Sequence, residues 1–206
     1  MKLAAAAVGS LCLAALLALL PPDAGAAEDD PTATVRETVD SVIEVLRNEE
    51  LPEATQLRQI EGLVGRHFAF RLMANRVLAT NWRKASTEQR ARFTALFKEL
   101  LINTYWQKIS RYSGETVRYT GVQMRSERYA TVTTVVSTDR LEIPVDYKLV
   151  KADEGWVAYD VVIEQVSLVR NYRGSFQSIV KDDGIDGLIR ELELRVAKSS
   201  ALNQNS

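Results

Sequence analysis

The chain has 206 residues, of which 26 are basic and 27 are acidic, so its formal net charge is −1. A near-neutral chain without a cluster of basic residues lacks the electrostatic surface that a nucleic-acid-binding face needs, and we expect no nucleic-acid partner. The length is sufficient for one domain with a sizeable core.

The N-terminus has the features of a secretory signal peptide over residues 1–26. Lys2 is followed by an uncharged apolar stretch at residues 3–20, two prolines, and small residues at 24–27. A basic start, an apolar segment and an A-x-A-like site are typical of an exported chain, with cleavage expected near Ala26. A retained membrane anchor is the alternative.

The single cysteine, Cys12, lies within this leader, so the mature chain would have no disulfide bond. An exported domain without disulfides must be held by its core alone, which is feasible at this length. We therefore expect the protein in the bacterial periplasm.

Helical periodicity dominates residues 27–113. Asp30 before Pro31 predicts a helix start, with the aspartate as N-cap and the proline in the first turn. Apolar residues then recur at helical spacing as far as Leu46, and again as far as Val64.

Two further helices are predicted in this half. One covers residues 66–80 and is followed by a connection at 81–85. The capping-box sequence Ser86–Gln89 then opens the longest helix. Its apolar stripe runs from Phe93 to Tyr105 and predicts one face packed against the rest of the domain.

From Thr116 the apolar residues recur with a period of two, which predicts a four-stranded antiparallel meander within residues 115–169. The last strand is expected from Trp156 to Leu168, with apolar residues on both of its faces. Such a strand must be covered on both sides, or must line a cavity on one of them.

Helical spacing returns over residues 170–198 with a stop at Gly184, and a polar tail is expected at 199–206. Helices, then a meander, then helices predict a single α+β domain over residues 27–198. In this fold class the helices pack on one side of a curved sheet.

Few residues offer catalytic chemistry. His67 is the only histidine, and no nucleophile elbow, phosphate-binding loop or metal-ligand spacing accompanies it. Asp160 and Glu164 lie four residues apart on the predicted last strand and would share a face. One of them could act as a buried general base, although pairing with a basic neighbour or contact with water is favoured.

The surplus of apolar residues on the last strand is compatible with a cavity between sheet and helices. Periodicity alone does not separate the lining of a cavity from a well-packed core.

Characteristic segments run through nearly the whole mature chain: Phe68–Phe70, Met73–Leu78, Trp82–Ser86, Gln89–Arg90, Val145–Tyr147, Trp156–Val161, Val166–Val169, Asn171–Arg173 and Gly184–Ile189. In their order and spacing the chain resembles the MlaC family of periplasmic phospholipid carriers, also called the toluene-tolerance auxiliary family. It departs from the family pattern at Gln165, where a glycine is usual, and at Ala69, where an aspartate is frequent.

The resemblance implies a curved antiparallel sheet of four to five strands, similar to nuclear transport factor 2. An N-terminal helical subdomain would cover the sheet, C-terminal helices would close it, and an apolar cavity would lie between them. The implied function is that of a carrier without cofactor or enzymatic activity. It would shuttle phospholipid between an outer-membrane lipoprotein–porin complex and an inner-membrane ABC transporter with a ring-shaped MCE-type substrate-binding protein. A hopanoid cargo is the alternative ligand.

Two sets of residues are expected at the site that the resemblance implies. The acyl chains would contact Met73, Val77, Phe97, Leu101, Tyr105, Tyr147, Val161, Ile163, Val166 and Leu168. The cavity mouth or a partner would contact Arg83, Arg90, Tyr172 and Arg173, for which a surface ion pair or a packed tyrosine is the alternative.

Overall fold

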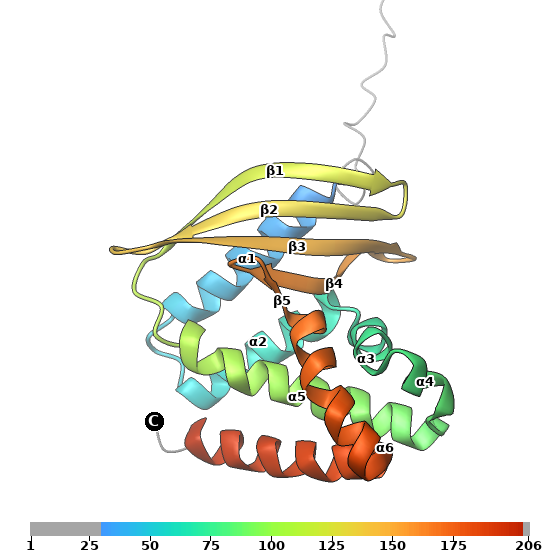
Figure 1. Ribbon diagram of the computed structural model, residues 1–206. Coiled ribbons are helices and arrows are strands. Elements are labelled where there is room, and N and C mark those ends of the chain that lie inside the picture. The colour runs from blue at the N-terminus through green and yellow to red at the C-terminus, as the bar shows by residue number, and fades with distance from the viewer. Residues whose placement is uncertain (1–29, 204–206) are drawn as a thin grey trace, which may run out of the picture.

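A curved antiparallel sheet lies against a layer of helices in the computed structural model, which describes residues 30–203 (Figure 1). The signal peptide expected at residues 1–26 lies outside the described residues. The α+β architecture predicted from the sequence is confirmed, with helices on one side of the sheet and the C-terminal helix crossing the helical layer.

The first half of the described chain forms helices. They are α1 (Pro31–Arg47), α2 (Glu53–His67), α3 (Phe70–Leu78), α4 (Thr80–Lys84) and α5 (Thr87–Ile109). The predicted caps are present: the Asp30 side chain accepts a hydrogen bond from the Thr32 amide, and Ser86 and Gln89 form a reciprocal capping box. These caps satisfy amides that the first turn of a helix leaves unpaired.

The helix predicted over residues 66–80 is wrong in its boundaries, because two helices meet there. The chain is extended at Phe68, and the Ala69 amide donates to the carbonyl of Ala158 in the sheet at 2.8 Å. At the other end, Ala79 has a φ of 52° and redirects the chain. The connection predicted at 81–85 is part of the short helix α4.

The strands are β1 (Thr116–Ser126), β2 (Tyr129–Ser137), β3 (Glu142–Ala152), β4 (Gly155–Ile163) and β5 (Val166–Ser167). Neighbouring strands pair antiparallel in the order of the sequence. The meander is therefore confirmed, but the last predicted strand is wrong beyond Ile163. Glu164 and Gln165 both have positive φ, at 48° and 68°, and turn the chain back so that β5 pairs with β4.

The C-terminal helix α6 (Leu168–Asn203) is interrupted at Gly184, where φ is 70° and ψ is −173°. The stop predicted at this glycine is confirmed, and the two helical halves meet there at a sharp angle (Figure 1). Helical structure continues to Asn203, into the segment expected to be a polar tail.

Buried apolar residues form three clusters. The largest joins α3, α5 and α6, with the rings of Phe93, Phe97 and Phe176 in contact. A second lies between α1 and the sheet, and a third, smaller cluster lies at one end of β3 and β4. Phe68, at the junction of α2 and α3, packs against all three clusters. Among residues 30–203, no helix combines the length and apolar character needed to cross a bilayer.

The hairpin at Glu164 and Gln165 gives a first prediction. Gln165→Gly should raise the free energy of unfolding by about 1 kcal/mol, because glycine adopts positive φ without the strain that a side chain adds. For a domain of this size that corresponds to an increase of about 2–4 °C in the melting temperature. The exposed Gln177 in α6 is the control, since glycine within a helix should lower stability by a similar amount. A Gln165→Gly melting temperature at or below that of the wild type would contradict the prediction.

Candidate functional site

An apolar cavity of about 450 Å³ lies between the sheet and the helices. Its helical wall is built from the first three helices and α5, and its other wall from the sheet. Residues on the helical side include Val39, Val42, Ile43, Leu46, Ile60, Val64, Phe68, Phe70, Met73, Leu101, Ile102, Tyr105, Trp106 and Ile109. Residues on the sheet side include Val117, Val136, Ile143, Val145, Tyr147, Val161 and Ile163, with Leu168 at the start of α6.

The sequence spacing explains both walls. Val39, Val42, Ile43 and Leu46 follow the i, i+3, i+4, i+7 rule and so share the face of α1 that looks toward the sheet. In the sheet, alternate residues of β3 and β4 point inward. Val145 pairs with Ile163 and Tyr147 with Val161, so these four side chains lie side by side on the cavity face.

A β-bulge explains part of the apolar pattern of β4, because it brings Val161 and Ile163 to the same face as Ala158. Lys148 pairs with Asp160, whereas the next residue of β3 pairs with Ala158, so Tyr159 has no counterpart in the register. Because of this extra residue, the side chains that face the helices are those of even-numbered residues before the bulge and of odd-numbered residues after it. Ala158 and Val161 therefore face the same side of the sheet, and both are buried.

Seven of the ten residues expected to contact acyl chains lie on the cavity wall. They are Met73, Leu101, Tyr105, Tyr147, Val161, Ile163 and Leu168. The hydroxyl groups of Tyr105 and Tyr147 are kept neutral, since burial raises the pKa of Tyr105 and raises that of Tyr147 to about 12. These two hydroxyl groups therefore add no charge to the cavity wall.

The other three do not line this cavity. Val77 and Phe97 are fully buried in the core among α3, α5 and α6, where the Phe97 ring meets Tyr172 edge to face. Val166 is 54% exposed, because the turn at residues 164–165 directs it away from the cavity.

The sequence reasoning missed the wall formed by α1 and α2. The apolar spacing of α1 was visible, but the same spacing occurs in a helix that packs on an ordinary core. Only the tertiary structure shows that the apolar wall residues of α1, from Val39 to Leu46, remain half-buried, whereas Val35 near the start of the helix is 4% exposed.

The four residues expected at the mouth do not line the cavity. Arg90 donates to the carbonyl groups of Trp82 and Arg83 and so binds the C-terminal end of α4. Arg83 is exposed on α4, at the opposite end of α5 from the cavity. Its contact with a partner stays a prediction.

Tyr172 and Arg173 hold the helical layer together. The Tyr172 ring packs against Phe176, and the Arg173 guanidinium donates from Nε to the Arg76 carbonyl at the end of α3, at 2.8 Å. Both residues are partly buried by these contacts. Neither of them lines the cavity, and their contact with a partner stays a prediction.

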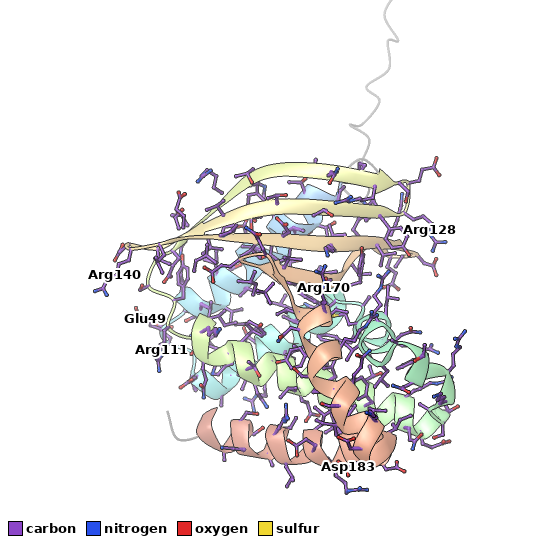
Figure 2. All side chains as sticks on the ribbon, viewed as in Figure 1. Glu49, Arg111, Arg128, Arg140, Arg170 and Asp183 are labelled. Atoms are coloured by element: carbon purple, nitrogen blue, oxygen red, sulfur yellow. The ribbon has the colours of Figure 1, made fainter. Side chains whose placement is uncertain are left out.

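The polar part of the cavity wall gathers at one end. It comprises Lys108, Tyr112, Glu115 and Thr138, where the end of α5, the start of β1 and the β2–β3 turn meet, together with Thr38 of α1. Figure 2 shows Glu49, Arg111 and Arg140, with charges of both signs, at this same end of the molecule. A largely apolar cavity thus has a charged, mixed-sign rim.

Tyr112 organises the rim. Its hydroxyl donates to the carbonyl of Glu115 at 3.1 Å and accepts from Nη2 of Arg47 at 3.0 Å. Glu115 accepts a hydrogen bond from the Ser113 amide, and backbone amides lower the pKa of its carboxyl group. Glu115 therefore remains charged at neutral pH.

Asp160 is a structural residue rather than part of the cavity wall. Its Oδ2 accepts from the Ser167 hydroxyl at 2.7 Å and lies 3.3 Å from Nζ of Lys148, while its Oδ1 accepts from the Val169 amide at 3.1 Å. These contacts fix the start of α6 to β4. Glu164 is exposed on the hairpin. The general-base interpretation needs a carboxylate at the bottom of the cavity, and neither residue lies there.

Other catalytic or metal chemistry finds no support at the cavity. His67 lies at the end of α2, outside the cavity wall, and burial lowers its pKa. Over the part of the chain that the structure describes, no cluster of three or more histidine, cysteine, aspartate or glutamate side chains is arranged to hold a metal ion.

Comparison with known proteins gives three similarities. A family model described as MlaC protein matches residues 36–194. The intermembrane phospholipid transport system binding protein MlaC of Haemophilus influenzae is 25% identical over 140 residues. That alignment covers 63% of this chain and 63% of the relative, so the chain spans less than two thirds of the relative's length.

A phospholipid-binding protein of Ralstonia solanacearum, solved in complex with a phospholipid, superposes with a TM-score of 0.76 and 25% identity. That match covers 83% of this chain and 99% of the solved one.

The role of Asp160 can be tested by its replacement. Asp160→Asn should lower the free energy of unfolding by about 2 kcal/mol, because it leaves Lys148 without its partner and weakens the contacts at the start of α6. Thermal unfolding followed by circular dichroism measures the change. Asp146→Asn on the neighbouring strand is the control and should change stability by less than about 0.5 kcal/mol. Equal stability of both variants would contradict the structural role.

Proposed function

The chain belongs to the MlaC family, and from this premise we propose that it binds phospholipid, with acyl chain in the cavity between sheet and helices. The observation that carries the proposal is the combination of an apolar wall with a charged rim at one end. A phospholipid has the same division between apolar tail and charged headgroup, so the tail would lie inside and the headgroup at the rim.

The energetic need for such a cavity is large. Each methylene group moved out of water contributes about 0.8 kcal/mol, so two chains of about 15 methylene groups represent on the order of 24 kcal/mol. A lipid therefore crosses an aqueous gap only if a protein supplies comparable apolar surface. The seven wall residues predicted from the sequence, together with the apolar face of α1, would supply it.

The cavity volume bears on the number of chains. A methylene group is similar in size to a water molecule, whose share of liquid volume is about 30 Å³. A cavity of about 450 Å³ thus has room for at least about 15 such groups, or one acyl chain. For a diacyl lipid we propose that the wall moves outward.

The part of the wall that is best suited to move is the second half of α1. The buried residues of this helix are Pro31 and Val35, both near its start. From Val39 onward its apolar side chains are only partly buried around the cavity. Two hydrogen bonds tie this half to its neighbours, one from Gln56 to the Val45 carbonyl and one from Arg47 to the Tyr112 hydroxyl. Outward displacement of this half of α1 would admit the second chain without breaking the core among α3, α5 and α6.

We further propose that the protein acts as a carrier in the periplasm, exported by the leader expected at residues 1–26. It would receive and deliver phospholipid at an outer-membrane lipoprotein–porin complex and an inner-membrane ABC transporter with an MCE-type ring. Transfer between protein pockets needs only a small net free-energy difference, because the lipid never enters water. Such transfer requires no catalytic group. The buried carboxylate of Asp160 has a structural role, and we propose that the protein has no enzymatic activity.

Identification of the bound lipid tests the proposal. Protein purified from its host should carry a diacyl phospholipid, detected by native mass spectrometry and by extraction. A triterpenoid mass would indicate a hopanoid cargo instead. A protein uniformly free of lipid would contradict lipid binding.

A matched pair of variants tests the location of the acyl chain. Val136→Trp places a large side chain in the cavity and should remove most of the co-purified lipid, because little volume remains for a chain. Val135→Trp is the control, since adjacent residues of a strand point to opposite faces. It should leave the lipid content unchanged. Equal lipid content in the two variants would place the chain elsewhere.

A further inference from the structure

A second hollow, of about 410 Å³, adjoins the charged rim of the cavity. It shares Tyr112 and Glu115 with the cavity wall, so the two spaces adjoin at the rim. In contrast to the cavity, it is bordered by charges of both signs: the carboxylates of Asp40, Glu44 and Glu115 and the guanidinium of Arg47.

Three of these charges lie on one face of α1. Asp40, Glu44 and Arg47 are separated by four and three residues, which places them next to one another along the helix. All three are exposed, and within residues 30–203 none of them forms an ion pair with another side chain. Their charges are thus available to a ligand at the rim.

Tyr112 holds the Arg47 side chain, and most of the N–H donors of Arg47 stay free. Arg47 uses one N–H group to contact the Tyr112 hydroxyl, and its guanidinium carbon lies 5.7 Å from the centre of the Tyr112 ring. A guanidinium has five N–H donors in a planar fork that matches phosphate oxygens. Arg47 therefore presents a phosphate-binding group beside the apolar cavity.

We propose that this hollow binds the headgroup of a zwitterionic phospholipid with a primary ammonium group, such as phosphatidylethanolamine. The phosphate would contact Arg47, and the ammonium group would contact Asp40 and Glu44. This inference rests on the proposed function, because it takes the acyl chain to lie in the adjoining cavity. Glu115 is engaged by the Ser113 amide and is not needed as a ligand.

The net charge of the hollow would favour a zwitterionic headgroup over an anionic one. Three carboxylates and one guanidinium leave the hollow with a net charge of −2. The headgroup of phosphatidylglycerol carries a phosphate and no cation, so it would gain the contact with Arg47 but leave the two α1 carboxylates facing a like charge. A zwitterion satisfies both signs at once. Since ion pairs at exposed positions are weak, the expected preference is modest, about threefold.

Uptake from mixed vesicles tests the selectivity. The purified protein is incubated with vesicles of equal amounts of phosphatidylethanolamine and phosphatidylglycerol with identical acyl chains, separated from them, and the bound lipids are quantified by mass spectrometry. The wild type should contain about three times more phosphatidylethanolamine than phosphatidylglycerol. The Asp40→Asn/Glu44→Gln variant should contain the two lipids in a ratio near one.

The matched control removes two negative charges far from the rim. Asp182→Asn/Asp183→Asn alters exposed residues of α6, and Figure 2 shows Asp183 well away from the end that carries Glu49 and Arg111. This variant should keep the wild-type ratio, which separates the effect of the hollow from that of net charge. Arg47→Gln should lower retention of both lipids about twofold, because both carry a phosphate.

The outcomes distinguish the two proposals. Lipid uptake without preference in the wild type, or a ratio that the Asp40→Asn/Glu44→Gln variant leaves unchanged, would overturn the headgroup site and leave lipid binding intact. An Arg47→Gln variant that retains both lipids as the wild type does would overturn the phosphate contact. A wild-type protein that takes up neither lipid would contradict the proposed function itself.

Discussion

The hydrogen bond from the Ala69 amide to the Ala158 carbonyl is the contact on which the architecture depends. It fixes the junction of α2 and α3 to β4 and so sets the separation of the helical layer from the sheet. Phe68, next to it, packs against all three apolar clusters and also lines the cavity. The core and the cavity meet at this side chain, as they do at Met73 and Val161. A polar backbone contact at this point satisfies groups that a buried connection would otherwise leave unpaired.

Much of the fold was predictable, because local rules decide it. The caps at Asp30 and Ser86, the stop at Gly184 and the meander all follow from residues within a few positions of each feature. The bulge at Tyr159 and the turn at Glu164 and Gln165 were not predictable in this way. Neither contains glycine, and tertiary contacts hold the backbone there: β3 fixes the register on one side, and β5 returns on the other.

The residues of the candidate site were predictable in part, because local sequence patterns identify some of them. Alternation along β3 and β4 identified residues such as Tyr147 and Val161. Helical periodicity alone did not separate Met73 from Val77, which are both fully buried on α3, although only Met73 lies on the cavity wall. A charged residue is still harder to assign. Asp160 lies on an apolar strand, as a catalytic group could, but its carboxylate is held by Ser167 of β5 and Val169 of α6, which follow later in the chain.

The cavity also makes the protein an incompletely packed one. Interiors are normally close-packed, and side chains along an internal void lose the dispersion contacts that a neighbour would give them. The cargo would therefore complete the core, and its binding free energy would add to the stability of the fold. Because the volume change of unfolding scales with the void volume that unfolding eliminates, the empty form would be the more sensitive of the two to hydrostatic pressure. The compressibility of this domain would thus depend on whether cargo occupies its cavity.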